Sequence, residues 1–139
     1  MNQTEKLDAL KECGVLAAAD GAALQRLVDA AETETFATGK VVFEEGEMSS
    51  RVYVVALGSL QVRLGDKLVS FAEAGALFGE YAMFAKGVRT ARVLAAEPSV
   101  LLSFAAAEFR EFLLQCPAVM MELLQTAVRR LHRVERRRG

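Results

Sequence analysis

The segment from Thr35 to Phe71 combines a two-residue apolar repeat with regularly placed glycines. Polar residues such as Gln61 and Arg63 fill the positions between the apolar ones. This period places apolar side chains on one face of a β-strand, and glycines mark turns because they adopt positive φ at little cost. The segment therefore predicts short antiparallel strands. Its apolar positions are Val41, Phe43, Tyr53, Val55, Leu57, Leu60, Val62 and Leu64, and its turn glycines are Gly39, Gly46, Gly58 and Gly65.

Helical patterns precede and follow the strands. Before Thr35, the sequence predicts two short helices, and Asp20 is a suitable N-cap for the second of them. From Ala105 onward the helical period returns, and Pro117 suits the first turn of a last helix that runs to the C-terminus. Two more strands are predicted on either side of Pro98. The order is helices, strands, helices.

We therefore predict one domain over residues 1–139, of the α+β class and mainly β. Its centre is an antiparallel β-roll, similar to a jelly-roll barrel, over residues 35–104. Residues 1–34 form N-terminal helices and residues 105–139 form long C-terminal helices. A chain of 139 residues is long enough for one hydrophobic core.

Composition excludes several classes of protein. With 53% hydrophobic and 25% charged residues, the chain belongs with folded globular proteins. It contains no apolar run of about 18 residues, and its charged N-terminus does not resemble a signal peptide, so a cytoplasmic location is expected. Cys13 and Cys116 lie far apart and His132 is the only histidine. We expect reduced thiols, no metal site, no cofactor and no enzymatic activity.

Positive charge is concentrated at the C-terminus. Residues 129–138 carry six Arg and one Glu, a net charge of +5, which leaves −6 for the rest of a chain whose total is −1. Positive charge near the end of a helix is favoured by the helix dipole. Contact with nucleic acid is the alternative, and we do not expect it.

The segment from Phe78 to Val93, FGEYAMFAKGVRTARV, holds the candidate site. Gly79 lets a ligand approach its backbone N–H, and residues 80–84 can form one helical turn whose amides bind an anion. The guanidinium of Arg89 offers paired donors to phosphate, and the Thr90 hydroxyl adds another. Glu80 requires a hydroxyl donor, so these groups together indicate a sugar phosphate. The alternative is that Glu80 and Arg89 form an ion pair that closes a loop.

These residues resemble a known motif. The pattern F-G-E-x-A, a loop, then R-T-A-x-V is similar to the phosphate-binding cassette of cyclic nucleotide-binding domains, the superfamily of catabolite activators and kinase regulatory subunits. The resemblance implies that Glu80 accepts the ribose 2′-OH and that Arg89 binds the cyclic phosphate. It also implies that Thr90 and the backbone amides of Gly79 and Ala91 complete the phosphate site. Val88 replaces the usual proline. The motif residues are Phe78, Gly79, Glu80, Ala82, Arg89, Thr90, Ala91 and Val93.

The last helix resembles the dimerising helix of bacterial catabolite activators, which implies that Arg130 reaches toward the ligand. Val134 and Glu135 stand where those activators carry the hydroxyl pair that contacts the base. Apolar residues recur at spacings of four and three, which predicts a homodimer seam, and the same residues could instead form an intramolecular lid. The seam consists of Met120, Leu124, Ala127, Leu131 and Val134.

The resemblance implies a sensor that binds a cyclic nucleotide and signals through its C-terminal helix to an unknown protein effector. It favours cAMP over cGMP, although Thr90 is associated with cGMP in the kinases of the family. The chain ends after the last helix, so we expect a standalone binding domain of bacterial type. The alternative is an interaction β-roll that no longer binds nucleotide and docks an acidic partner or nucleic acid through its Arg-rich helix.

Overall fold

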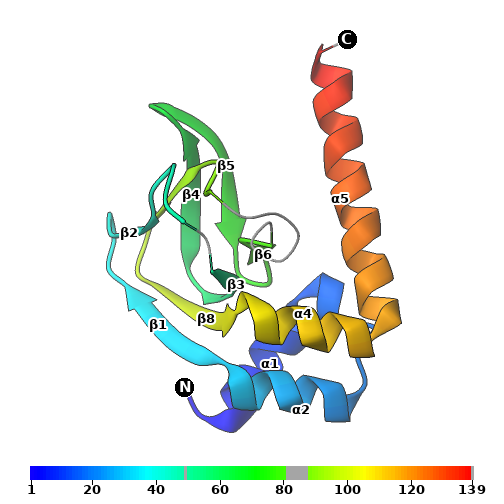
Figure 1. Cartoon of the computed structure of the whole chain (residues 1–139). Helices are drawn as coiled ribbons and strands as arrows, with labels where there is room; N and C mark the ends of the chain where they lie inside the picture. Colours follow the sequence, from blue (N-terminus) through cyan, green and yellow to red (C-terminus); the bar gives the residue numbers. More distant parts are fainter. Residues whose placement is uncertain (49, 81–87, 139) are drawn as a thin grey trace.

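The computed structural model describes residues 1–48, 50–80 and 88–138, and only the backbone of residues 130–138. Along the chain, helices precede and follow the strands, as predicted (Figure 1). The helices are α1 (Gln3–Glu12), the 3-10 helix η1 (Gly14–Leu16), α2 (Gly21–Ala30), α4 (Ala106–Gln115) and α5 (Pro117–Arg138). The strands are β1 (Glu32–Phe36), β2 (Val41–Phe43), β3 (Arg51–Leu57), β4 (Ser59–Leu64), β5 (Lys67–Glu73), β6 (Leu77–Phe78), β7 (Arg92–Ala95) and β8 (Ser99–Ala105).

In the described part of the chain the strands form two four-stranded antiparallel sheets. The strand order is β1-β8-β3-β6 in one sheet and β2-β7-β4-β5 in the other. Consecutive strands β3 and β4 thus lie in different sheets, which is typical of a roll and not of a simple meander. The predicted α+β class and antiparallel β-roll are confirmed.

Two hydrophobic cores hold this arrangement together. One lies inside the roll and includes Phe43, Tyr53 and Val55. The other lies between the helices and the opposite face of β3 and β8, where Phe104 and Phe109 are fully buried. Strand β3 is consequently buried on both faces, with Val52 and Val54 directed toward the helices. A period of two does not reveal this second face, because β3 has apolar residues at every position from 52 to 57.

Three predicted details were wrong. Helix α2 ends at Ala30 because Ala31 is extended, with φ −74° and ψ 129°, so the first strand begins at Glu32 and not at Thr35. At the other end of the roll, Ala105 closes β8, and α4 starts one residue later than predicted. Leu57 and Leu64 were assigned to apolar strand faces, yet they are 58% and 48% exposed. The strand register shifts just before each of them, between Val55 and Leu57 and between Val62 and Arg63.

Other predictions are confirmed. The Oδ1 atom of Asp20 accepts a hydrogen bond from the Ala23 N–H at 2.8 Å, which caps α2. Pro117 is the first residue of α5. The four predicted turn glycines all have positive φ.

Helix α5 begins against the body of the molecule and then leaves it. Its first turns pack on α4 and η1 through the buried residues Val119 and Leu123. In Figure 1 its C-terminal half, orange to red, extends away from α1, α2 and α4. Among the described residues, no helix combines the length and apolar character needed to cross a membrane.

The helix-facing core supports a stability prediction. Phe104 is fully buried and its ring lies 5.5 Å from that of Phe109, centroid to centroid. We expect F104A to lower the free energy of unfolding by about 3–5 kcal/mol, because the substitution leaves a cavity. Urea denaturation measures this loss. As a control, F71A removes a ring that is 54% exposed and should cost about 0.5 kcal/mol or less.

Equal losses in the two variants would contradict the assignment of Phe104 to the core.

Candidate functional site

The loop between β2 and β3 fixes the backbone of Arg89. The Arg89 N–H donates to the Glu47 carbonyl at 2.8 Å, and the Gly46 N–H donates to the Arg89 carbonyl at 2.9 Å. A bridge between Met48 and Val88 extends the same antiparallel pairing. Arg89 is therefore held at a defined place at one end of the roll, ten residues in sequence from Gly79 but beside it in space.

The Arg89 side chain turns into the roll and is only 8% exposed. Its Nη2 donates to the Arg51 carbonyl at 2.9 Å, and its Nη1 donates to the Gly79 carbonyl at 3.4 Å. A guanidinium has five N–H donors, so these two contacts do not exhaust it. The two carbonyls orient the guanidinium as neutral acceptors, and the negative charges of Glu47 and Glu80 also act on it.

Two aromatic rings lie beside this guanidinium, and a third ring packs on both of them. The Cζ atom of Arg89 lies 4.0 Å from the ring centroid of Phe43 and 5.8 Å from that of Tyr53. Tyr53 and Phe78 are stacked with centroids 5.1 Å apart, and Phe43 lies 6.1 Å from Phe78. The contact with the Phe43 face is a cation–π interaction, which partly compensates for the loss of water around the charge.

Burial is the main influence on the charge of Arg89. It lowers the pKa of the guanidinium from its ordinary value, and this effect is opposed by Tyr53, by Glu47 and by Glu80. Burial likewise raises the pKa of the Tyr53 hydroxyl, with the negative charge of Glu34 acting in the same direction. A cation that has already lost much of its water attracts an incoming anion more strongly than a solvated one.

Gly79 permits the close approach of Arg89. Its φ is +80°, and a Cβ atom at this position would lie 2.9 Å from Arg89 Nη1 and 3.1 Å from the Arg51 carbonyl oxygen. Any larger residue would combine backbone strain with a clash. The sequence indicated a role for this glycine in ligand approach, and the structure adds that it makes room for the arginine.

The structure brings some of the predicted site residues together. Phe78, Gly79 and Glu80 are half-buried near Arg89, whose pKa the Glu80 carboxylate raises. Thr90 is exposed and Ala91 is half-buried. The predicted helical turn, including Ala82, falls on residues 81–87 and lies outside the described residues, as does the side chain of Arg130.

Three contributors to the site were not identified from the sequence. Phe43 and Tyr53 were assigned only to the apolar face of strands, and the Arg51 carbonyl was not considered. Alternation identifies a buried face but does not say which buried side chain lies against a cation. A backbone carbonyl carries no sequence signal at all.

A separate cavity of about 290 Å³ lies between η1, the segment Gly75–Leu77 and α5. Gly75–Leu77 directly precedes Phe78 and Gly79 in the sequence, so the segment before the site borders the same cavity as the last helix. On α5 it is bordered by Glu122, Leu123, Thr126 and Arg129.

The described residues include both cysteines and most of the other residues that could bind a metal. Within them, no three His, Cys, Asp or Glu side chains are grouped as metal ligands. Cys13 and Cys116 are free thiols; Cys13 is buried, and this burial raises the pKa of its thiol.

Several known proteins are similar to this chain in sequence. The family described as the cyclic nucleotide-binding domain matches residues 33–116. The Pycsar effector protein PaPycTIR of Pseudomonas aeruginosa is 33% identical over 109 residues, which cover 78% of this chain and 35% of that protein. A cGMP-dependent protein kinase of Eimeria tenella is 32% identical over 109 residues, covering 78% of this chain and 11% of the kinase. The chain thus spans about a third or less of the length of these relatives.

The fold is also found in a solved structure. The regulatory domain of Toxoplasma gondii PKA, crystallised with cAMP, superposes with a TM-score of 0.80 at 24% identity, covering 91% of this chain and 50% of that one. This likeness concerns the arrangement of the strands and helices.

Proposed function

Because this chain belongs to the family of cyclic nucleotide-binding domains, we propose that it binds a 3′,5′-cyclic nucleotide as a non-catalytic sensor. One observation carries the proposal. Arg89 is almost fully buried, and its guanidinium contacts two neutral carbonyls and an aromatic face. An arginine in such surroundings is well suited to a singly charged phosphate diester.

The phosphate would bind to the donors of Arg89 that the carbonyls do not use. The backbone N–H groups of Gly79 and Ala91 and the hydroxyl of Thr90 are the proposed additional donors. Thr90 is exposed, so its hydroxyl is accessible from solvent. A cyclic phosphate has two exocyclic oxygens, which the paired N–H groups of a guanidinium can bind together.

The ribose would bind to Glu80. A carboxylate near a phosphate is repelled unless it accepts hydrogen bonds, and the 2′-OH of the ribose is a suitable donor. Glu80 is half-buried and directly follows Gly79, which supports a position beside the proposed phosphate site. This division of roles also explains why a carboxylate, Glu80, and a guanidinium, Arg89, occur in the same motif.

For the base we propose cAMP ahead of cGMP. The Toxoplasma domain was crystallised with cAMP, whereas the Eimeria relative is named for cGMP. The contacts proposed for Arg89 and Glu80 involve the phosphate and the ribose, which all cyclic nucleotides share. Adenine, guanine, cytosine and uracil derivatives therefore belong in the same titration.

Signalling is proposed to pass from the nucleotide site to α5. Gly75–Leu77 precedes the site directly, and it shares the cavity of about 290 Å³ with α5. A cavity between two elements gives one of them room to shift against the other. A ligand that binds better to one position of α5 would change the population of that position, which an unknown protein effector could detect.

We also propose a homodimer through α5. Met121, Leu124 and Val128 are 54–57% exposed and follow one another at spacings of three and four. Met120, which the sequence assigned to the seam, is half-buried against the chain's own core, and Ala127 is exposed. The structure describes only the backbone of Leu131 and Val134. The seam is thus centred on Leu124.

We expect L124E to weaken dimerisation at least about tenfold, because it places a charge in an apolar seam. Sedimentation velocity measures the dimer, and Q125E is the matched control, since Gln125 is exposed, adjacent and off the stripe. A wild-type chain that stays monomeric at about 100 µM, with and without nucleotide, would exclude the dimer.

Calorimetric titration of the purified chain tests the central proposal. The four cyclic nucleotides are compared with 5′-AMP, which carries a ribose and a phosphate that is not cyclised. Binding that is selective for a cyclic nucleotide supports a sensor. Absence of heat for all of them, once extraction has shown that no nucleotide co-purified, would support an interaction β-roll instead.

A further inference from the structure

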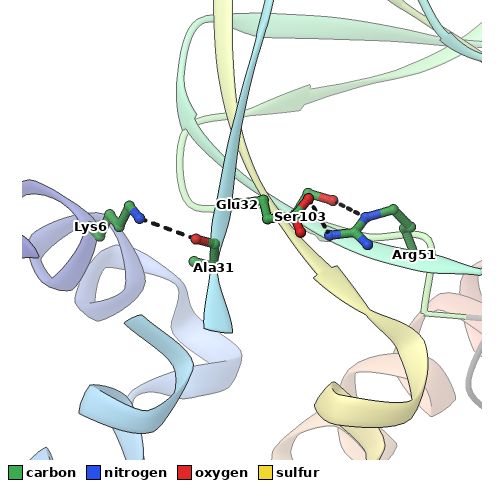
Figure 2. Close-up of polar contacts among 5 residues, drawn as sticks. All are labelled: Lys6, Ala31, Glu32, Arg51 and Ser103. Carbon is green, nitrogen blue, oxygen red and sulfur yellow. Dashed lines mark hydrogen bonds and ion pairs between the residues drawn. The ribbon is translucent and has the colours of Figure 1, made fainter. Parts of the chain in front are cut away.

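Arg51, the first residue of β3, is bonded through both its side chain and its backbone. Its side chain crosses to the neighbouring strands, where Nε donates to the Ser103 hydroxyl and Nη2 lies 3.2 Å from Oε2 of Glu32 (Figure 2). Ser103 belongs to the central strand β8 and is fully buried, and Glu32 belongs to β1 on the far side of β8. One guanidinium therefore joins three strands of the sheet.

The carbonyl of the same residue accepts the hydrogen bond from Arg89 Nη2 at 2.9 Å. This is the shorter of the two carbonyl contacts that orient the Arg89 guanidinium, the other being 3.4 Å to Gly79. Arg51 thus connects the strands of the sheet to the cation of the candidate site without its side chain lying in that site.

We propose that Arg51 is a positioning residue for Arg89. Its anchored side chain holds the β3 backbone so that the Arg51 carbonyl stays in place to orient the guanidinium. The effect on nucleotide affinity rests on the proposed function, whereas the effect on Arg89 itself does not. The neutral variant R51M keeps the carbonyl but loses both the anchorage and the positive charge of the side chain. S103A removes one anchoring hydrogen bond and keeps that charge, so the two variants together separate position from charge.

Anchorage by a side chain has its largest effect at the end of a strand. The ladder between β3 and β8 ends with Arg51 opposite Ala105. Beyond this pair, the one backbone hydrogen bond between the two segments, among the described residues, runs from the Ala106 N–H to the Ser50 carbonyl at 2.9 Å. Terminal pairs of a ladder open more readily than central ones. A side chain bonded to a fully buried serine resists that opening.

The two acceptors of the Arg51 side chain differ in how strongly they are expected to hold it in place. Ser103 is fully buried, so its hydrogen bond is shielded from water. The Glu32 side chain is 71% exposed, so its ion pair with Arg51 is screened by solvent. We therefore expect Ser103 to matter more than Glu32 for the position of the Arg51 carbonyl.

The experiment compares R51M, S103A and E32Q with R63M as the matched control. Arg63 is an arginine of β4 that is bonded in a similar way, through Nε to Gln61 Oε1 at 2.9 Å and through Nη1 to the Asp66 carbonyl at 3.0 Å, and neither contact involves Arg89. The first readout is the rotation of the Arg89 Nη groups in the nucleotide-free protein, followed by ¹⁵N NMR. R89K identifies these signals by their absence. The second readout is affinity for cAMP.

We expect R51M and S103A to accelerate Arg89 Nη rotation and to weaken cAMP binding about three- to tenfold, the loss typical of one net hydrogen bond. E32Q should change both by less, and R63M should change neither. If the wild type binds no nucleotide, the NMR readout alone decides the positional role.

Two results would overturn the proposal. One is a folded R51M protein with Arg89 rotation equal to that of the wild type. The other is an equal acceleration in R63M, which would indicate a general loosening of the roll. Because unfolding of S103A would remove that variant from the comparison, thermal melting is recorded for each protein, and R51M then carries the test.

Discussion

Replacing Arg89 by alanine is expected to weaken the binding of cyclic nucleotide by on the order of 100-fold or more. The guanidinium is 8% exposed and is the charged centre of the proposed phosphate site. Without it, the phosphate would enter a poorly solvated pocket with no cation beside it, so desolvation would no longer be compensated. Calorimetric titration of R89A and wild type with the same cyclic nucleotide measures the loss.

The lysine variant separates charge from geometry. R89K keeps a positive charge but loses the paired donors and the planar contact with Phe43. Its affinity should fall between those of wild type and R89A. R92A is the matched control, because Arg92 is exposed and pairs with Glu44 at 2.7 Å.

We expect R92A to retain affinity within about threefold of wild type, since exposed ion pairs contribute little. An R89A protein that remains folded and binds as tightly as wild type would exclude Arg89 from the ligand site. That result would leave the ion pair with Glu80 as the interpretation of this motif.

The second large effect is expected at Gly79. G79A should lower the free energy of unfolding by about 1–3 kcal/mol, because alanine is strained at a φ of +80°. The new Cβ would also lie 2.9 Å from Arg89 Nη1 and 3.1 Å from the Arg51 carbonyl, so the guanidinium must move away from its carbonyl acceptor. We expect nucleotide affinity to fall about tenfold or more.

G39A provides the control for strain. Gly39 has a φ of +83°, close to that of Gly79, and a Cβ built there meets nothing within 4 Å. Both variants should therefore lose stability through backbone strain, but only G79A should lose affinity beyond that. Urea denaturation and titration on the same samples distinguish the two effects. Equal affinity in the two variants would show that the space beside Arg89 is unimportant for binding.

Arg89 and Gly79 together determine the position of one guanidinium. Folding removes water from the Arg89 guanidinium and fixes its plane with two carbonyls before any ligand arrives. The proposed binding of nucleotide would then require less reorganisation of the protein, which is the usual advantage of a preorganised site. Gly79 allows this arrangement, and Arg51 is proposed to maintain it.

The amino-acid sequence was sufficient for the fold class and for the motif. Alternation between Val41 and Leu64 predicted strands because side chains on a strand must point to opposite faces. Asp20 and Pro117 marked helix starts through local chemistry that acts within a few residues. The family of the motif from Phe78 to Val93 was likewise apparent from residue types and their spacing, and the family match over residues 33–116 agrees with it.

Only the tertiary structure decided what surrounds Arg89. Phe43 and Tyr53 lie far from it in sequence, and their positions depend on how β2 and β3 pack across the roll. The bulge that exposes Leu57 and the packing of Met120 on the chain's own core depend on strand register and on helix placement. Local patterns report which side chains are apolar, because that is a property of each residue. Which apolar face meets a cation is a property of the long-range pairing, so no short segment of this chain contains that information.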